Sequence, residues 1–547
     1  MSLSLPNACV PGTFSPSVFG ANISSVQANL VSNYSSFAID YFRYTAPSVQ
    51  VENATFCNVT VTYTHPGQND TVITEAWLPL NWNERFMAAG GGGWTAGRFF
   101  LSYSNMDGAI ADGYATVTTD AGLGNSSTPE TWALRSPGVV DLFKYQNMGS
   151  VALNDEAIIA KSLIKSFYGK DPKYSYWNGC SHGGRQGMMM AQRFPSVYDG
   201  IAAGAPAIHW NELASYAGWA YQIMSEIKEY PYPCEVDAIT AAAVSACDSL
   251  DGVTDGIIAE AEECLVRFDP FSVVGKTTAC AQLNGTEKAI SKTAAIVVNA
   301  TWHGMTTEDG QQVYHGLLPG ADLTGNGKNS LGQGGLAATL CNESGCGVGA
   351  GKGSIFFRLF VEKNAEADVS NITRAQFDDF VHSARQQYDS FMETADPDLR
   401  RFQEAGGKLL TFHGLADSSI PSRATKEYYN AVTGVIPNIH DFYRYYEVPG
   451  LGHCFGGVSG QPDSLFQQLR NWVENGTAPE STPVKVTVGE NEVHNRILCP
   501  YPQKAQFSTK CGNASVADCW ACAKPSGSNS LKNTASSSIK ATQLRLV

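Results

Sequence analysis

The sequence predicts an α/β fold: a largely parallel sheet built from two separated parts of the chain, with a second domain inserted between them. Short apolar or β-branched segments alternate with segments that carry apolar residues at helical spacing, which is typical of βαβ units. The alternation fills the first two hundred residues and returns after residue 404. The stretch 209–404 is instead helix-like, rich in loops and holds six cysteines. We therefore expect a discontinuous sheet domain, 1–208 and 405–547, and an inserted domain, 209–404.

The individual elements follow from local patterns. Residues 60–78 alternate β-branched side chains around a Pro-Gly-Gln-Asn-Asp turn, which predicts a hairpin. A short apolar strand, 85–89, runs into four glycines, Gly90 to Gly93, whose backbone N–H groups can face a ligand without obstruction. The later patterns predict strands at 112–120, 174–178, 200–205, 407–413 and 441–448, and helices at 147–167 and 187–193.

Composition narrows the class of protein. The chain has 547 residues, with 37 Lys+Arg against 51 Asp+Glu, a formal net charge of −14. Charged residues make up 16% and hydrophobic residues 43%, which indicates a globular protein rather than a disordered one. An acidic chain without a basic run has no electrostatic reason to bind nucleic acid or anionic lipid. No apolar run approaches the ~18 residues of a spanning helix, so we expect no membrane association.

Cysteines and asparagines indicate a secreted protein. The 14 cysteines are spread along the chain, and the single CxxC, Cys519 to Cys522, has no second pair or histidine pair nearby, which disfavours zinc and favours disulfides. Twelve asparagines head N-x-S/T sequons, which predicts glycosylation in a secretory pathway. The first residues have neither a basic nor an apolar leader segment, so we expect an extracellular protein whose signal peptide is absent from this sequence.

The strongest local motif is Gly179-Cys180-Ser181-His182-Gly183, a G-x-S-x-G between a predicted strand and a predicted helix. Small residues on both sides allow the tight turn that lifts a serine hydroxyl above the sheet edge. The context argues against an ordinary glycine turn. Ser181 is therefore a candidate nucleophile.

A serine nucleophile needs a histidine base and a carboxylate that orients it. Asp417 lies in a loop just past a predicted strand, and His453 lies between glycines after the next predicted strand. The order serine, acid, histidine is that of α/β hydrolases. His413, four residues before Asp417, is expected to pack or hydrogen-bond beneath that loop.

The backbone N–H after the nucleophile, that of His182, is expected to form an oxyanion hole together with an N–H of the glycine loop. Gly91 and Gly92 are the candidates there. The His182 side chain is expected to point away from the oxyanion.

Cys180 precedes Ser181 and Cys454 follows His453. If the serine and histidine are hydrogen-bonded, a disulfide between their neighbours is geometrically reasonable. It would tie nucleophile and base together across more than 270 residues of chain.

Three aspartates fall within eight residues of the inserted domain: Asp248, Asp251 and Asp255, with glycines after two of them. Such carboxylates repel one another unless a cation joins them, and calcium prefers hard oxygen ligands. The spacing differs from an EF-hand, and a solvated acidic turn is the alternative. Cys247 and Cys264 bracket the loop and would brace it.

The chain resembles the tannase and feruloyl esterase family of secreted fungal hydrolases. The likeness rests on Cys180-Ser181, Asp417 and His453-Cys454, together with the aspartate loop and the large insert. That family also includes bacterial members acting on a terephthalate monoester. The likeness runs from about Cys9 to Cys522. It implies an α/β-hydrolase domain and a lid that covers the active site and binds one structural Ca²⁺.

By this resemblance Ser181 is the nucleophile, His453 the base and Asp417 its orienter. The implied calcium ligands are the side chains of Asp248, Asp251 and Asp255 and the backbone carbonyls of Val253 and Ile257. The implied disulfides are Cys9–Cys57, Cys180–Cys454 and Cys247–Cys264. Cys234–Cys280 and Cys341–Cys346 are further candidates, and the pairing of the four C-terminal cysteines stays open.

We therefore expect a secreted serine carboxylesterase that acts on small phenolic esters and feruloylated polysaccharide fragments, releasing ferulic, p-coumaric or caffeic acid from plant cell-wall material. A tannase that cleaves galloyl esters is the alternative, because no motif reports the polarity of the acyl pocket. A non-catalytic secreted glycoprotein with a hydrolase fold is a remote third possibility.

Overall fold

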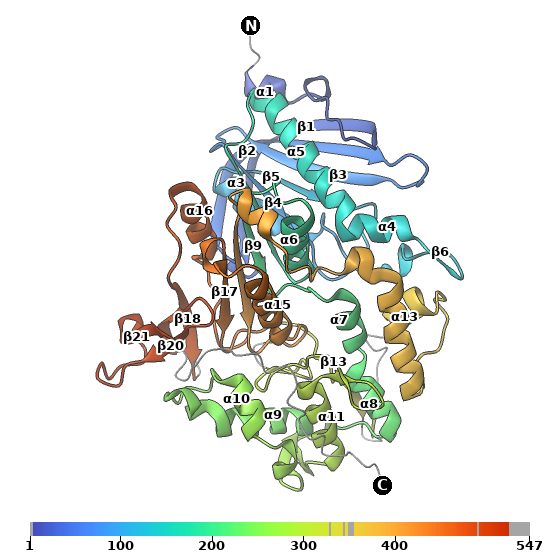
Figure 1. Ribbon diagram of the computed structural model, residues 1–547, viewed down its shortest axis with the longest axis vertical. Coiled ribbons are helices and arrows are strands. Elements are labelled where there is room, and N and C mark those ends of the chain that lie inside the picture. Colours follow the sequence, from blue (N-terminus) through green and yellow to red (C-terminus); the bar gives the residue numbers. More distant parts are fainter. Residues whose placement is uncertain (1–3, 328–329, 343–344, 348–354, 490–491, 525–547) are drawn as a thin grey trace.

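The computed structural model describes residues 4–327, 330–342, 345–347, 355–489 and 492–524. Its centre is a nine-stranded sheet with the order β1-β2-β3-β5-β4-β8-β9-β16-β17 (Figure 1). The strands are β1 (Asn22–Ala38), β2 (Val49–Thr64), β3 (Val72–Pro79), β4 (Arg85–Ala89), β5 (Ala115–Thr119), β8 (Tyr174–Cys180), β9 (Gly200–Gly204), β16 (Lys408–Gly414) and β17 (Tyr443–Val448).

The sheet combines an antiparallel edge with a parallel centre. The neighbours β1, β2, β3 and β5 pair antiparallel, whereas every pair from β5 through β4, β8, β9 and β16 to β17 is parallel. The predicted α/β class with a parallel sheet is confirmed. Strands β5 and β9 are buried throughout, as parallel strands covered on both faces must be.

Helices cover both faces of the sheet. Successive residues of β8 show this directly, because Tyr176 packs into one apolar core and Trp177 into the other. Helices α5 (Ala152–Tyr168), α6 (His182–Arg193) and α15 (Ser422–Val435) contribute to the core of Trp177. Helix α16 (Leu465–Asn475) packs on the side of Tyr176, and α3 (Phe100–Ala111) packs against β1, β2 and β5.

The chain leaves the sheet after β9 and returns at β16, and the inserted segment, defined as residues 209–404, lies between. Most of it lies below and to the right of the sheet in Figure 1, coloured green to gold. Its helices are α7 (Trp210–Tyr216), α8 (Trp219–Ile227), α9 (Pro233–Cys247), α10 (Ala261–Arg267), α11 (Lys292–His303), α13 (Arg374–Met392) and α14 (Arg400–Glu404), and its hairpins are β10–β11 (Thr277–Cys280, Thr286–Ala289), β12–β13 (Met305–Thr306, Gln312–Tyr314) and β14–β15 (Leu340–Asn342, Gly345–Gly347).

The chain crosses twice between the sheet and the inserted segment, first near Ile208 and again near Thr394. These two crossings run side by side. The backbone N–H of Thr394, at the second crossing, donates to the carbonyl of Ile208 at the first, at 3.1 Å. The second crossing also contacts the helix that follows β8, because Arg185 of α6 donates to the carbonyl of Met392 and to the hydroxyl of Thr394.

Two C-terminal hairpins stand outside the nine-stranded sheet. They are β18–β19 (Thr482–Val488, Glu492–Leu498) and β20–β21 (Lys504–Phe507, Trp520–Ala523), drawn beside α10 in Figure 1. Arg496 and Lys504 reach the inserted segment and pair with Asp255 and Glu260. Residues 482–523 thus bridge the two parts of the molecule, whereas the sequence grouped them with the sheet.

Most predicted elements are present, with shifted ends. The hairpin at 60–78 is β2–β3, and the helix predicted at 187–193 already begins at His182. The helix predicted at 147–167 starts with a π-helical turn, Asn147–Val151, before α5. Within the described part of the chain, each helix is too short or too polar to cross a bilayer.

The sequence patterns missed strand β1. It is 17 residues long, lies at one edge of the sheet, and within the described residues pairs with β2 alone. Its register against β2 shifts at three places, between Ile23 and Ser25, between Val31 and Tyr34, and between Tyr34 and Ser36. The strand is largely exposed, so it lacks the apolar alternation that identifies a half-buried strand.

Candidate active site

Ser181 occupies a sharp turn between β8 and α6. Its φ is +63° and its ψ −123°, a strained backbone conformation that residues other than glycine rarely adopt. The turn needs glycines around it: a Cβ on Gly179 would come within 2.6 Å of the Gly183 carbonyl oxygen, and one on Gly184 within 2.3 Å of the Gly204 carbonyl oxygen. The G-x-S-x-G sequence therefore permits this packing and exposes the serine hydroxyl at the start of a helix.

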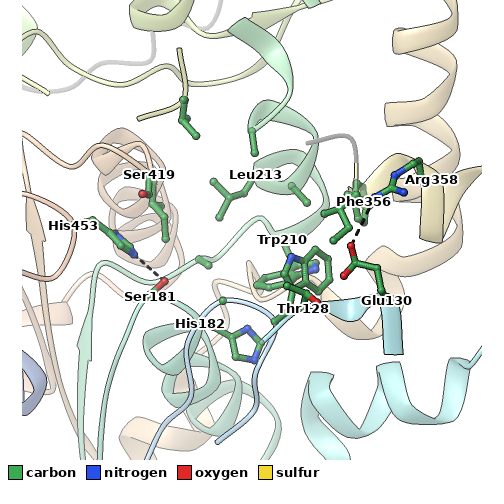
Figure 2. Close-up of a pocket in the computed structure, with 18 residues that line it drawn as sticks. Thr128, Glu130, Ser181, His182, Trp210, Leu213, Phe356, Arg358, Ser419 and His453 are labelled. Atoms are coloured by element: carbon green, nitrogen blue, oxygen red, sulfur yellow. Dashed lines mark hydrogen bonds and ion pairs between the residues drawn. The ribbon is translucent and has the colours of Figure 1, made fainter. Parts of the chain in front are cut away.

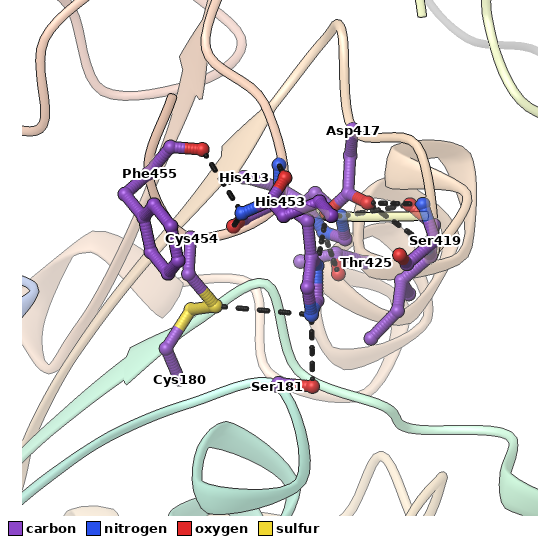
Figure 3. Close-up of polar contacts among 11 residues, drawn as sticks. Cys180, Ser181, His413, Asp417, Ser419, Thr425, His453, Cys454 and Phe455 are labelled. Carbon is purple, nitrogen blue, oxygen red and sulfur yellow. Dashed lines mark hydrogen bonds and ion pairs between the residues drawn. A yellow bond between two sulfur atoms is a disulfide. The ribbon is translucent and has the colours of Figure 1, made fainter. Parts of the chain in front are cut away.

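His453 lies directly opposite this hydroxyl. Its Nε2 is 2.9 Å from Ser181 Oγ, and both side chains lie at the edge of a cavity (Figure 2). His453 Nδ1 is 2.8 Å from Oδ2 of Asp417 (Figure 3). Serine, histidine and aspartate are thus joined in one hydrogen-bonded chain, although Ser181 and His453 are separated by 272 residues.

Asp417 is held rigidly. Its Oδ1 accepts the backbone N–H groups of Ser419 and Ile420, each at 2.8 Å. Its Oδ2 also lies 3.1 Å from Nε2 of His413, a buried histidine whose Nδ1 is 2.8 Å from Thr425 Oγ1. Burial opposes ionisation of Asp417, but the charges of the two histidines and their hydrogen bonds outweigh it and hold its pKa well below the ordinary value.

The four glycines after β4 differ in what their N–H groups do. The Gly91 N–H donates to Gln186 Oε1 at 2.8 Å, and the Gly92 N–H donates to the Thr95 carbonyl at 3.0 Å. Both amides are therefore already engaged, which argues against the predicted role of Gly91 and Gly92 as oxyanion donors. Gly93 lines the cavity beside Ser181, and no partner for its N–H is found among the described residues.

His182 contributes a backbone N–H at the first position of α6, where helical N–H groups have no intrahelical partner. Its ring is fully buried and packs edge-on against Trp210, with a centroid distance of 4.9 Å. Figure 2 shows the ring turned away from Ser419 and Leu213. Burial lowers the pKa of His182 well below the ordinary value, so this ring is neutral.

A disulfide joins Cys180 to Cys454, with the two Cα atoms 6.0 Å apart (Figure 3). It fastens the residue before Ser181 to the residue after His453. The other disulfides are Cys9–Cys57, Cys234–Cys280, Cys247–Cys264, Cys341–Cys346, Cys499–Cys522 and Cys511–Cys519.

Gln333 of the inserted segment holds the backbone around His453, which the sequence did not indicate. Its Nε2 donates to the carbonyls of His453 and Phe455, at 2.5 and 3.3 Å, and its Oε1 accepts the His453 N–H at 3.3 Å. The inserted segment therefore fixes the loop that carries the histidine. No local motif marks such a long-range contact.

The cavity above Ser181 has a volume of about 530 Å³ and a mostly apolar wall (Figure 2). Trp94, Trp210 and Phe356 supply its aromatic surface, and Trp94 meets Trp210 edge to face. The other apolar residues include Ala207, Leu213, Ala214, Ala217, Leu336, Ile355 and Ile420.

Besides Ser181, His182 and His453, four polar side chains interrupt this wall: Thr128, Glu130, Arg358 and Ser419. Arg358 Nη2 lies 3.7 Å from Glu130 Oε1, so a charged pair faces the cavity from two different parts of the chain. The sequence did not mark either residue, because the pair forms only when the inserted segment folds over the sheet domain.

The aspartate loop makes local hydrogen bonds. Asp248 Oδ1 accepts the backbone N–H groups of Asp255, Gly256 and Ile257, and Asp251 Oδ1 accepts that of Val253 at 3.0 Å. Arg496 pairs with Asp255, whereas no basic side chain in the described ranges pairs with Asp248 or Asp251. Burial, aided by the charge of Asp255, raises the pKa of Asp251 to about 6.

The three aspartates are not gathered as tightly as a preformed metal site. Among the residues that the structure describes, the group of three potential ligands whose donor atoms lie within 4.8 Å of one another is His209, Glu212 and Glu393. The carboxylates of the aspartate loop would have to close on an ion. Their oxygen donors suit calcium chemically, because two of the three lack a basic partner.

Known proteins resemble this chain in sequence and architecture. Residues 57–523 match the family model described as tannase and feruloyl esterase. A probable feruloyl esterase of Arthroderma benhamiae is 35% identical over 497 residues, which cover 88% of this chain and 89% of the relative. A tannase of Aspergillus oryzae is 31% identical over 515 residues, covering 85% and 84%.

A solved structure gives the same result. The tannin acyl hydrolase from Aspergillus niger superposes with a TM-score of 0.83 at 30% identity and covers 96% of each chain. The family match spans most of this chain, and the relatives are covered nearly completely. The chain therefore belongs to the tannase and feruloyl esterase family of α/β hydrolases and is a carboxylic ester hydrolase.

Proposed function

We propose that the protein is a serine esterase that releases hydroxycinnamic acids through an acyl-enzyme. The observation that carries this proposal is the hydrogen-bonded chain Ser181, His453 and Asp417 at the edge of a large apolar cavity. His453 Nε2 accepts the proton of Ser181 Oγ as that oxygen attacks the ester carbonyl. His453 then donates the proton to the departing alcohol oxygen.

The second half of the reaction uses the same groups. Water, activated by His453, attacks the acyl carbonyl, and the proton returns to Ser181 Oγ as the acid leaves. Asp417 Oδ2 accepts the Nδ1–H of His453 throughout, which keeps Nε2 free to accept a proton and stabilises the cationic ring.

The negative oxygen formed in both halves needs hydrogen-bond donors. The N–H of His182 is one donor. The other is the N–H of Gly93, because Gly93 lines the same cavity while the amides of Gly91 and Gly92 are engaged.

A feruloyl, p-coumaroyl or caffeoyl group suits the wall of this cavity. Its planar ring and double bond can pack against Trp94, Trp210 and Phe356, and an apolar wall tolerates a methoxy substituent. The substrates are small phenolic esters and feruloylated fragments of plant cell-wall polysaccharide. The relative named a feruloyl esterase supports this choice.

Tannase activity is the second candidate, and a specific observation favours it. Thr128, Glu130 and Arg358 place a hydroxyl, a carboxylate and a guanidinium in the cavity wall, and a galloyl ring needs partners for three hydroxyls. The relatives named tannase and tannin acyl hydrolase support this reading.

Two measurements test these assignments. A fluorophosphonate probe is expected to label the protein and not the Ser181→Ala variant; an unreactive wild type would overturn the serine mechanism and favour a non-catalytic glycoprotein. The kcat/KM values for methyl ferulate, p-coumarate, caffeate and gallate then decide the acyl group. A clear preference for gallate would make the enzyme a tannase.

The inserted segment serves as a lid with one structural Ca²⁺, held by the side chains of Asp248, Asp251 and Asp255 and the backbone carbonyls of Val253 and Ile257. The support is the pair of carboxylates, Asp248 and Asp251, for which the described residues provide no basic partner. The ion braces the loop and takes no part in the chemistry.

The protein is a secreted glycoprotein. Its support is the set of seven disulfides, which persist in oxidising compartments, together with the position of the sequons. None of the twelve sequon asparagines is buried, and ten of them are exposed. Mass spectrometry of the secreted protein before and after glycosidase treatment tests this assignment.

A further inference from the structure

A cluster of three metal-ligating side chains lies at the two crossings of the chain, away from the aspartate loop. His209 and Glu212 belong to the first crossing and the start of α7, and Glu393 directly follows α13 at the second. One donor atom of each lies within 4.8 Å of the other two. None of the three lines the cavity that holds Ser181.

The cluster contains buried polar atoms that have no hydrogen-bond partner among the described residues. Glu212 is 6% exposed, and its Oε2 is unpaired, as is Oε2 of Glu393. The hydroxyl of Tyr314 is a third unpaired atom on a residue that is 4% exposed. The Tyr314 ring packs edge to face against the His209 ring, with the two centroids 6.2 Å apart, so Tyr314 borders the cluster.

The existing contacts do not satisfy these atoms. A His209 ring nitrogen contacts Oε1 of Glu393, and Arg385 Nε lies 2.9 Å from Oε1 of Glu212. Both partners therefore use the Oε1 atoms. The Arg385 side chain is 50% exposed, so water screens its charge from the buried pair.

Leaving two carboxylate oxygens and a phenol unpaired in a buried site is costly, and each such group calls for a missing partner. An imidazole nitrogen with two carboxylates is a donor set for a divalent transition metal ion. Bond lengths of about 2.0–2.2 Å imply separations near 3.3 Å between tetrahedral ligand atoms. The donor atoms of the three side chains lie within 4.8 Å of one another, so small adjustments of the side chains would bring them to ligating distance.

We infer that His209, Glu212 and Glu393 form a binding site for a divalent transition metal ion such as zinc, with a water in the fourth position facing the Tyr314 hydroxyl. The site is structural. It adds a link between the two crossings, which are also joined by the hydrogen bonds from Thr394 to Ile208 and from Asn211 to Asp389. Trp210, next to His209, lines the cavity, so the ion holds one wall of that cavity in place.

The test is direct metal analysis of the purified full chain. After treatment with EDTA and desalting, the protein is incubated with zinc in the presence of excess calcium, which keeps the aspartate loop out of the measurement. One retained zinc per chain is expected in the wild type. Isothermal titration should show binding weakened at least ~10-fold in His209→Ala and in Glu393→Gln.

His315→Ala is the matched control, because His315 pairs with Glu427 close by but lies outside the cluster. It should retain the zinc. The proposal is overturned if the wild type retains none, or if the cluster variants bind zinc as tightly as the wild type and His315→Ala do. Should the variants fail to fold, crystals of the wild type soaked in zinc decide: an anomalous peak between the three side chains supports the site, and its absence there refutes it.

Discussion

Ser181 and Cys454 share the same left-handed φ of +63°, and the disulfide from Cys180 to Cys454 joins their two turns. Each turn positions one partner of the contact between Ser181 and His453. A strained backbone persists only where its surroundings hold it, and here the covalent bond connects the two strained turns directly.

Replacing both Cys180 and Cys454 with alanine should lower kcat more than it lowers stability. A small misplacement of nucleophile and base can cost ~100-fold in rate. The measurement is kcat on a phenolic methyl ester together with the melting temperature. Removal of the Cys9–Cys57 disulfide, at the other end of the sheet domain, is the control and should lower the melting temperature without changing kcat. An unchanged kcat in the variant that lacks Cys180 and Cys454 would disprove the positioning role.

Gln333→Ala should lower kcat by roughly 10-fold with little change in KM. The variant leaves the backbone of His453 without its side-chain partner, and buried hydrogen bonds of this kind are worth about 1 kcal/mol each. Steady-state kinetics on methyl ferulate measures the effect. Gln387→Ala, whose amide bonds within its own helix, should match the wild type, and equal kinetics for both variants would exclude a role for Gln333.

Arg358→Met should alter the choice between acyl groups. A hydrogen bond from the guanidinium to a galloyl hydroxyl is worth about 1–2 kcal/mol, so kcat/KM for methyl gallate should fall roughly 10-fold relative to methyl ferulate. Arg400→Met, at an exposed arginine outside the cavity, serves as the comparison. An unchanged ratio in Arg358→Met would show that this residue does not contact the ring substituents.

Stability should fall at alkaline pH through His65. The hydrogen bond that the His65 ring donates to the Asp155 carboxylate outweighs the opposing effect of burial, and together with Asp70 it raises the pKa of His65 to about 9. Since this pKa exceeds the unfolded value of about 6.5, the stabilisation is complete below pH ~6.5 and is lost as pH rises through about 9.

The melting temperature of His65→Gln, measured against the wild type from pH 6 to 10, tests this dependence. The difference in melting temperature between the two proteins should correspond to about 2 kcal/mol in the free energy of unfolding at pH 6 and shrink toward pH 10. His303→Gln, which removes an exposed histidine bonded only to a backbone carbonyl, should show no such trend. A difference that stays constant with pH would contradict the predicted titration.

Removing calcium should lower the melting temperature by roughly 5 °C and leave kcat nearly unchanged, because the aspartate loop lies outside the cavity. Calcium added back should restore the transition. Asp251→Asn should abolish this response, whereas Asp368→Asn, at an exposed aspartate of the inserted segment, should retain it. If neither chelation nor Asp251→Asn has an effect, the loop is a solvated acidic turn.

Local patterns predicted the parts of the fold that depend on neighbouring residues. The hairpin β2–β3 and the central strands follow from apolar and β-branched runs, and the turn at Ser181 follows from the glycines that allow it. Covered parallel strands are apolar on both faces, which makes them easy to detect.

Long-range contacts explain what the sequence did not reveal. The Gln186 side chain and the Thr95 carbonyl accept the N–H groups of two of the four consecutive glycines, Gly91 and Gly92. Neither contact can be deduced from the glycine run itself. Gln333 and Arg358 matter only once the inserted segment lies over the sheet. The same holds for the cluster of His209, Glu212 and Glu393, whose members are up to 184 residues apart.

Strand β1 ends the sheet with an open edge that could recruit a strand from a second molecule. Flat, regular edges promote such edge-to-edge aggregation, and bulges that twist the strand prevent it. The three register shifts of β1 break its outer row of hydrogen-bonding groups into short pieces. The irregular edge thus disfavours the addition of a strand from a second molecule.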